Sequence, residues 1–223
     1  QIICHNYGFL HFAKRFFSPL LVSLLESTET GTVEVHVSNH TSRGLPVIVR
    51  WEITDAAGKR IEEGRFDVEA LAQRSVPAGR IGLEHLRAGS PPLPVEIQNC
   101  PHPPREADRD LLVWAWLEHE GAVCSENLAF LARPKHLLLQ RPGISLELGP
   151  CTETTAEIMV GTDVASPWTQ LESGAVEGDF SDNFFHLHPR HPRRITFQAR
   201  GDLKAEAFLA GLRATPLLAR SAP

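Results

Sequence analysis

Apolar and polar residues alternate with a period of two along most of the 223-residue chain. Val33, Val35 and Val37 are separated by polar residues, and the same alternation runs through residues 47–53. Successive side chains of a β-strand point to opposite faces, so this period is typical of strands that bury one face only. The chain is therefore predicted to consist mainly of half-buried strands.

Turns and loops separate these predicted strands. Asp-Ala-Ala-Gly at 55–58 predicts a hairpin turn with a return strand over residues 59–68, because glycine tolerates the positive φ that such turns need. The prolines of residues 90–104 predict an extended loop, since proline has no backbone N–H to donate to a sheet. The most hydrophobic hairpin, 111–118 with 122–132, is expected to form the centre of a first core.

A second set of alternating segments follows a boundary. Arg133-Pro134 and Pro142-Gly143 supply turn residues on both sides of a short apolar run. The final stretch predicts a short helical turn over residues 202–210 and then a closing strand over 212–217. The alternating apolar positions of this second set lie within residues 144–148, 156–160, 185–187 and 195–199.

The beginning of the chain follows the helical period instead. Phe9, Phe12 and Phe16 fall on one face at this spacing, and Pro19 ends the pattern. A helix this short cannot bury so many aromatic side chains by itself. We therefore expect it to pack against a partner surface.

These patterns predict an all-β fold, with two tandem immunoglobulin-like β-sandwich domains preceded by one short N-terminal helix. The predicted domains are the helix at 1–19, a first sandwich at 20–133 and a second, smaller sandwich at 134–223. Neither sandwich has the Cys, Trp, Cys spacing of antibody domains, so this prediction depends on the number of strands and on their alternation.

The distribution of charge argues against some classes of partner. The formal net charge is −5, and Arg190, Arg193 and Arg194 form the only tight basic group, so no nucleic-acid partner is expected. The apolar run at 20–25 is too short to cross a bilayer, so no membrane partner is expected either. Asn39-His40-Thr41 matches the N-glycosylation pattern, which matters only in a eukaryotic secretory compartment, and the sequence does not identify the compartment.

Cys4, Cys100, Cys124 and Cys151 are widely spaced and form no CxxC pair. A zinc site made of thiolates is therefore not expected. A disulfide between Cys100 and Cys124 would require their strands to pair. The favoured prediction is four unpaired, mostly buried thiols.

His186, His188 and His191 are the candidate metal ligands. Residues i and i+2 of a strand project to the same face, and a third histidine in the next turn would close a site. However, no acidic or thiolate fourth ligand is fixed nearby, and a chain with 11 histidines contains such a pair by chance. The favoured prediction is that the chain binds no metal and no other cofactor.

Two pairs of acidic residues were considered for hydrolytic chemistry, Asp179 with Asp182 and Glu118 with Glu120. A glycosidase holds two carboxyl groups about 5 to 10 Å apart across a cleft, and one of them has a raised pKa. Acids at the turns of small sandwiches more often face solvent or accept hydrogen bonds from backbone amides. No catalytic residue is therefore assigned.

Tryptophan side chains are candidates for stacking on sugar rings. Trp51, Trp114 and Trp116 lie in strand patterns, where packing in the core is the expected use of a large ring. Trp168 follows Ser166-Pro167 in a predicted loop and is the candidate carbohydrate-binding residue. The alternative for Trp168 is packing between domains.

The stretch GDFSDNFFHLHP at 178–189 combines aromatic, acidic and histidine residues, but its predicted role is structural. The Ser-Asp-Asn tripeptide at 181–183 is expected to bond backbone amides where the chain turns into a strand. Phe180 and Phe185 are expected to anchor the two sides of this turn in the core.

Four segments resemble successive landmarks of the β-mannosidases of glycoside hydrolase family 2. FLHFAKRFFSPLLVSL at 9–24 is similar to the join at which the last helix of the family's catalytic barrel runs into the following sandwich. The other three occur in the family's order, so that the resemblance covers nearly the whole chain. They are CSENLAFLARPKHLLLQRPGI at 124–144, GDFSDNFFHLHP at 178–189 and FLAGLRATPLL at 208–218.

The resemblance implies the non-catalytic C-terminal region of a retaining glycosidase that removes terminal β-linked mannose from the non-reducing ends of mannosides. The family's two catalytic glutamates belong to the barrel, and no segment of this sequence matches their motifs. The implied partners are the catalytic barrel of the same polypeptide, of which residues 1–19 would be the terminal helix, and the mannoside substrate of the intact enzyme. The implied role is to buttress that barrel. Two alternatives remain, a stand-alone carbohydrate-binding or adhesion module and a small hydrolase.

Overall fold

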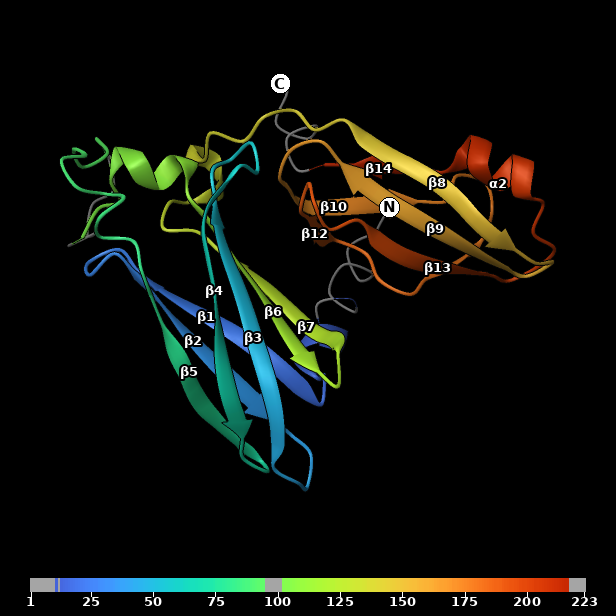
Figure 1. The fold of residues 1–223 in the computed structure, drawn as a ribbon. Helices are drawn as coiled ribbons and strands as arrows, with labels where there is room; N and C mark the ends of the chain where they lie inside the picture. Colours follow the sequence, from blue (N-terminus) through green and yellow to red (C-terminus); the bar gives the residue numbers. More distant parts are fainter. Residues whose placement is uncertain (1–10, 12, 95–101, 217–223) are drawn as a thin grey trace. The chain divides into compact units, whose positions relative to one another are not determined.

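The computed structural model describes residues 11, 13–94 and 102–216. Residue contacts divide the chain into two compact units (Figure 1). Residues 14–138 form one unit, called here the N-terminal sandwich. Residues 139–216, with His11 and Ala13, belong to the other unit, called here the C-terminal sandwich. The predicted all-β fold with two immunoglobulin-like sandwiches and a short helix before them is confirmed.

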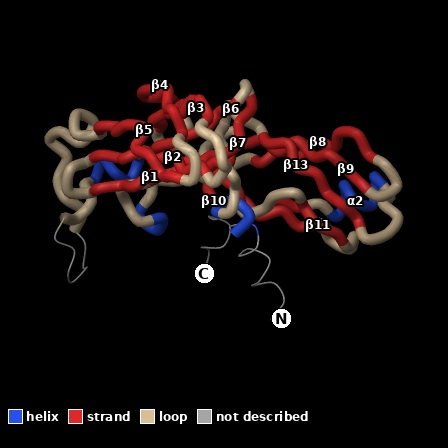
Figure 2. Tube along the Cα trace, turned by 90° about the horizontal axis from the view of Figure 1, so that it is seen from below, coloured by secondary structure: helices blue, strands red, loops and turns tan. Residues whose placement is uncertain are grey.

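The N-terminal sandwich contains two antiparallel sheets. One sheet has the order β1 (Leu20–Ser27), β2 (Thr32–Asn39) and β5 (Arg74–Gly82). The other has the order β4 (Arg60–Ala70), β3 (Leu45–Thr54), β6 (Leu112–His119) and β7 (Ala122–Ala129). Figure 2 shows β3, β4 and β6 as one layer and β1 and β2 as the other.

The core of the N-terminal sandwich lies between the inner faces of these sheets. The predicted alternation is confirmed in β2 and β3, because every second residue of these strands is buried in the core. Trp51 packs over Gly64, its cross-strand neighbour, where a Cβ atom would lie only 2.4 Å from the indole ring. The buried core side chains include Val22, Val33, Val35, Val37, Val49, Ile53, Ile81, Val113 and Leu117.

The hairpin of β6 and β7 differs from its predicted place at the centre of the core. β6 is central, since it pairs with both β3 and β7, but β7 is an edge strand whose first three residues are exposed. Side chains of β7 bond the edge of the opposite sheet. The Val22 N–H donates to Ser125 Oγ at 3.2 Å, and Asn127 Nδ2 donates to the Val22 carbonyl at 3.1 Å.

The connections of the N-terminal sandwich contain two short 3-10 helices, η1 (Glu106–Asp110) and η2 (Pro134–His136). The predicted extended loop is present in its described parts, where Pro92 and Arg105 form an isolated β-bridge. Strand β5 was not predicted, because Pro77 and Gly79 interrupt its apolar pattern. A Cβ atom on Gly79 would lie 2.4 Å from the ring of Phe66, so this glycine makes room for a core aromatic residue.

The C-terminal sandwich also has two antiparallel sheets. The larger sheet has the order β11 (Gly178–Phe180), β13 (Arg193–Ala199), β9 (Thr155–Thr162) and β8 (Ile144–Cys151). The smaller has the order β12 (Phe185–Leu187), β10 (Ser166–Glu172) and β14 (Arg213–Thr215). The helix α2 (Ala205–Gly211) precedes β14, which confirms the predicted helical turn and closing strand.

Aromatic side chains fill the core of the C-terminal sandwich. Phe185, Phe197 and Phe208 are fully buried, and the rings of Phe197 and Phe208 stack with centroids 4.6 Å apart. Phe180 packs on Phe197 at 4.9 Å. The short strand β11 thus joins the core through the ring of Phe180, and β12 joins it through Phe185 and Leu187. This burial offsets the small number of ladder hydrogen bonds that these strands form.

The residues before β1 are helical at 11 and 13–16, as predicted. Phe9 and Phe12 lie outside the described residues. Phe16 and Phe17 are 64% and 85% exposed. No helix among the described residues is long and apolar enough to span a membrane. The predicted domain limits 1–19, 20–133 and 134–223 stay predictions.

Candidate functional site

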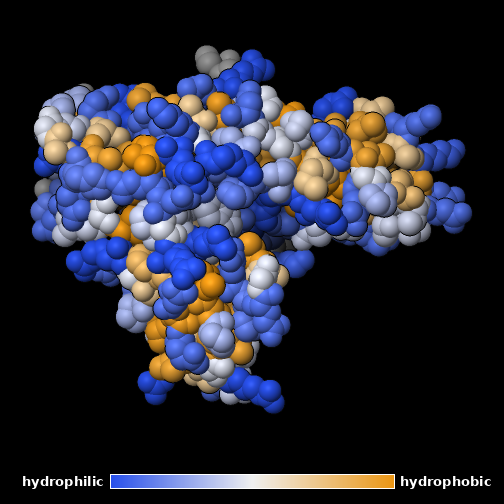
Figure 3. All heavy atoms as spheres, viewed as in Figure 1, coloured by the Kyte–Doolittle hydropathy of each residue, from blue (hydrophilic) through white to orange (hydrophobic). Residues whose placement is uncertain are grey.

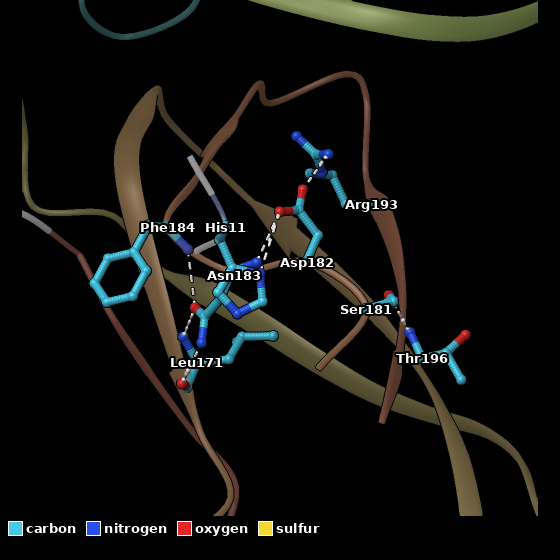
Figure 4. Close-up of polar contacts among 8 residues, drawn as sticks. All are labelled: His11, Leu171, Ser181, Asp182, Asn183, Phe184, Arg193 and Thr196. Atoms are coloured by element: carbon cyan, nitrogen blue, oxygen red, sulfur yellow. Dashed lines mark hydrogen bonds and ion pairs between the residues drawn. The ribbon is translucent and has the colours of Figure 1, made fainter. Parts of the chain in front are cut away.

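The tripeptide Ser-Asp-Asn at 181–183 joins β11 to β12, and Asn183 is its buried member (Figure 4). The Asn183 side chain bonds the backbone of β10, because its Oδ1 accepts the Leu171 N–H at 2.7 Å and its Nδ2 donates to the Leu171 carbonyl at 2.9 Å. The same Oδ1 also accepts the Phe184 N–H at 2.9 Å. Asn183 therefore replaces a ladder partner at a point where β12 is too short to supply one.

Asp182 is held by charge as well as by the backbone. Its Oδ1 accepts the Asn183 N–H at 2.8 Å, and its Oδ2 lies 2.9 Å from Arg193 Nη2. The Arg193 guanidinium in turn lies 4.8 Å from the centre of the Phe185 ring, and His11 Nδ1 lies 4.0 Å from Asp182 Oδ1. The predicted structural role of this turn is confirmed for the backbone bonds (Figure 4). The contact between Asn183 and Leu171 was not predicted.

Trp168 lies in strand β10 and not in the predicted loop. A bulge between Ser166 and Thr169 gives Trp168 a φ of +53°, which is unusual for a bulky residue. The Trp168 N–H donates to His186 Nδ1 at 3.4 Å, and the two rings meet edge to face at 5.2 Å. Trp168 is half-buried, and its assignment to carbohydrate binding stays a prediction.

The three candidate metal ligands have different neighbours. The rings of His188 and His191 lie 4.7 Å apart, whereas the ring of His186 lies against Trp168. His188 Nδ1 accepts the Arg190 N–H at 3.1 Å, which leaves only Nε2 for a metal. Burial lowers the pKa of His188 to about 3, with smaller contributions from His191 and Arg190. His188 is thus neutral at pH 7, but the metal assignment stays a prediction.

The acidic candidates are paired with basic residues. Asp179 Oδ2 lies 3.3 Å from Arg200, and Glu118 Oε1 lies 2.8 Å from Arg50 Nε. The side chain of Glu120 is 86% exposed at the turn between β6 and β7. Such an exposed carboxylate lacks the apolar surroundings of a glycosidase's general acid.

Two of the tryptophans expected in the core lie on the other face of their strand, where Trp114 is still buried. Trp51 packs against the core and against Phe66, with ring centroids 6.2 Å apart, as predicted. Trp114 and Trp116 instead stack on each other at 6.3 Å, and Trp114 Nε1 donates to Thr54 Oγ1 at 2.9 Å. The alternating positions of β6 are apolar on both faces, so its period alone does not decide which face is inside. The smaller side chains of Val113, Ala115 and Leu117 fill the core.

Sequence reasoning missed a groove on the N-terminal sandwich. The groove has a volume of about 640 Å³ and lies over β3, the end of β4 and the turn after β6. It contains Glu118 and Glu120, which were considered only as an isolated pair. The feature that could have pointed to the groove is the charged outer face of β3 and β4, where Arg50, Asp67 and Glu69 occupy alternate positions.

Two family models match the chain, one over each sandwich. A model described as a mannosidase Ig/CBM-like domain matches residues 31–136. A second mannosidase model, described as an Ig-fold domain, matches residues 139–218. No curated protein sequence matches this chain.

Solved structures of glycosidases contain both sandwiches in succession. The chain is similar to the β-D-mannosidase of Dictyoglomus thermophilum, with a TM-score of 0.73 and 20% identity, over 93% of this chain and 22% of that one. It is also similar to the exo-chitosanase CsxA of Amycolatopsis orientalis, with a TM-score of 0.54 and 12% identity, over 94% of this chain and 28% of that one. At these identities the likeness shows the fold, and the chain spans less than a third of either enzyme.

Proposed function

We propose that this chain, which belongs to the immunoglobulin-like domains of the family 2 β-mannosidases, is the non-catalytic C-terminal region of a β-mannosidase-like glycosidase. In this proposal the intact enzyme hydrolyses terminal, non-reducing β-D-mannose residues. The two sandwiches buttress a catalytic barrel that belongs to the same polypeptide. They contribute no catalytic residue.

One observation carries this proposal. Mannosidase domain models match both sandwiches, and the likeness to a single β-mannosidase extends over 93% of the chain. Two successive domains that both resemble parts of one larger enzyme are more simply explained by a structural role there than by two separate activities.

The exposed phenylalanines before β1 support a partner surface. Phe16 and Phe17 are adjacent and largely exposed, although large aromatic side chains are normally buried or used in interfaces. Their position immediately before Leu20 is the point where the resemblance places the join to the barrel. We therefore assign these two rings to the contact with the catalytic domain.

The pairing of the acidic candidates supports the absence of catalytic residues. Asp179, Asp182 and Glu118 each lie within 3.3 Å of an arginine. Each of these carboxylates forms an ion pair with an arginine of a neighbouring segment. None of them has the apolar enclosure that a glycosidase's general acid needs.

The test begins with the reading frame upstream of Gln1. Three proteins are compared: the continuous polypeptide, the same polypeptide ending at Pro19, and residues 1–223 alone. The measurement is the release of nitrophenol from an aryl β-mannoside. We expect turnover by the continuous polypeptide, a lower melting temperature and yield for the form that ends at Pro19, and no turnover by residues 1–223. Full stability and activity without the sandwiches would contradict the proposal.

Two further outcomes distinguish the alternatives. A reading frame that contains no catalytic domain upstream would favour a stand-alone binding or adhesion module. Turnover by residues 1–223 that a single carboxylate substitution abolishes would show a small hydrolase. The double variant Phe16→Ser, Phe17→Ser of the continuous polypeptide is expected to lose its catalytic activity at a lower temperature than the parent. Its KM is expected to be unchanged.

A further inference from the structure

The groove of the N-terminal sandwich lies on the outer face of the sheet β4, β3, β6 and β7. Its apolar floor includes Pro46 and Ile48 on the outer face of β3, and the carboxylates of Asp67, Glu69 and Glu118 lie around this floor. Figure 3 shows apolar atoms among hydrophilic ones over the lower ends of β3 and β4. All of the lining residues belong to the N-terminal sandwich, and its volume of about 640 Å³ is within the range of small-ligand sites.

The strand register places charged groups in a fixed order across the groove. Ile48 pairs with Asp67 on one side and with Glu118 on the other, so the three residues form one row across three strands. The outer residues of this row are separated by two strand spacings, about 10 Å. An apolar side chain between two carboxylates therefore forms the centre of the groove.

Arg50 supplies donors to the same surface. Arg50 Nε lies 2.8 Å from Glu118 Oε1, and the Arg50 side chain is 63% exposed. This contact is an ion pair, and a guanidinium has five N–H donors in all. The side chains of Arg50 and Glu118 thus present donors and acceptors side by side.

This arrangement fits vicinal hydroxyl groups. One hydroxyl oxygen can accept a hydrogen bond from the Arg50 guanidinium while the neighbouring hydroxyl donates to Glu118. Carboxylates outnumber cations among the residues that line the groove, since Asp67, Glu69 and Glu120 also line it, although Asp67 Oδ2 lies 3.4 Å from Nε of the neighbouring Arg65. The groove therefore favours ligands that mainly donate hydrogen bonds and repels anionic ligands.

We propose that the groove built on Arg50, Glu118 and Ile48 binds a neutral saccharide, with a pyranose ring lying on Ile48 and its vicinal hydroxyls between Arg50 and Glu118. A peptide strand fits less well, because the groove lies on the face of the sheet and not along the free edge of β4, where an added strand would pair. The proposed binding is a property of the N-terminal sandwich alone. It does not depend on the proposed link to a catalytic domain.

The test uses residues 1–223 labelled with ¹⁵N and titrated with mannotetraose in heteronuclear NMR spectra. We expect shifts of the amide signals of the groove residues on β3, β4 and β6, and none on the sheet β1, β2 and β5. Arg50→Ala and Glu118→Gln are each expected to weaken binding at least tenfold. Asp67→Asn changes the exposed wall of the groove and leaves the ion pair between Arg50 and Glu118 intact. We expect this variant to bind mannotetraose two- to fivefold more weakly.

Arg80→Ala is the matched control. Arg80 is also 63% exposed and lies 2.8 Å from a glutamate, Glu34, but on the other sheet. We expect its affinity for mannotetraose to equal that of the parent chain. Unchanged amide signals away from each substitution show that the variants fold.

Four outcomes would overturn the proposal. The first is the absence of shifts, or shifts confined to residues outside the groove. The second is equal binding of oligogalacturonate, which the excess of carboxylates should repel. The third is binding of chitosan oligosaccharide without binding of mannotetraose, which would show simple ion exchange. Loss of saccharide binding in the Arg80→Ala variant would also count against the groove.

Discussion

Arg87 and Asp108 form a buried ion pair in the N-terminal sandwich, with their side chains 6% and 0% exposed. Arg87 Nε lies 2.8 Å from Asp108 Oδ1 without the alignment of a hydrogen bond, and Arg87 Nη2 donates to Asp108 Oδ2 at 3.1 Å. Arg87 also donates to the Thr28 carbonyl, and Asp108 Oδ2 accepts the Arg105 N–H. The pair therefore fastens η1 and the loop after β5 to the turn between β1 and β2.

Removal of one partner of this pair leaves the other charge buried. Asp108→Ala is expected to lower the free energy of unfolding by about 3 to 5 kcal/mol. The measurement is urea unfolding followed by tryptophan fluorescence, which mainly reports the N-terminal sandwich because three of the four tryptophans lie there. The control is Arg80→Ala, which removes one partner of an exposed ion pair and is expected to change stability far less than Asp108→Ala. Equal effects of the two substitutions would refute the role of the buried pair.

Two substitutions in the turn at 181–183 are expected to lower the stability of the protein by different amounts. Asn183→Asp places a carboxylate oxygen against the Leu171 carbonyl and removes a donor, so we expect a loss of about 3 kcal/mol. Asp182→Ala removes more exposed contacts, and about 1 to 2 kcal/mol is expected. Hydrogen exchange of the β10 amides in each variant measures both losses. A larger effect of Asp182→Ala would mean that the buried amide contributes less than its contacts suggest.

The glycosylation pattern at Asn39 conflicts with the fold. Asn39 is fully buried, its Nδ2 donates to the carbonyls of Arg43 and Ala70 at 2.8 Å, and its Oδ1 accepts two bonds from Thr41. A glycan on Nδ2 would remove these donors and could not be enclosed. We therefore expect folded protein from a eukaryotic secretory host to be unmodified at Asn39, as measured by mass spectrometry with and without glycosidase treatment.

A control for this experiment is an exposed acceptor in the same protein. Glu120→Asn with Ala122→Thr creates one at the turn after β6, where the φ of +52° also suits asparagine. This variant is expected to gain one glycan and to fold. Folded parent protein with a glycan on Asn39 would contradict the prediction.

His188 makes stability depend on pH. Its pKa is lowered to about 3 in the folded chain, mainly by burial, while an unfolded histidine titrates near its ordinary 6.5. Between these two values the unfolded state binds more protons than the folded state, so stability falls as pH falls from about 6.5 towards 3. The expected slope is up to about 1.4 kcal/mol per pH unit. Urea unfolding at a series of pH values measures it.

The matched variant for this measurement is His188→Asn. Its side-chain oxygen can replace Nδ1 as the acceptor of the Arg190 N–H, but it does not titrate. The pH dependence between 6.5 and 4 should be smaller in this variant. An unchanged slope would assign the pH dependence to other groups.

The sequence identified most strands but not all of their roles. Val33, Val35 and Val37 were correctly predicted to lie in the core, because only one face of β2 is apolar. In β6 both faces are apolar, so the period could not show that Trp114 and Trp116 lie on the face opposite Val113, where Trp114 is still buried. Strand β5 was missed because a glycine such as Gly79 usually indicates the end of a strand. The sequence does not show that the ring of Phe66 packs against this glycine.

In the candidate site, contacts between neighbouring residues were also predicted and contacts between separate strands were not. The local bonds of Asp182 follow from its place in a turn, and they were predicted from neighbouring residues alone. The contact of Asn183 with Leu171, the bulge that turns Trp168 out of regular strand geometry and the row from Asp67 through Ile48 to Glu118 join separate strands. No spacing within a single segment encodes them.

The sequence by itself determined the alternation of side chains, the turns and the two sandwiches, because strand geometry and turn chemistry act over a few neighbouring residues. Only the tertiary structure decided which face of β6 packs between the two sheets, which charge Asp108 meets and where the groove lies. These features arise when segments far apart in the chain compete to remove the same surfaces from water, and the outcome depends on the volumes and charges of all of them together.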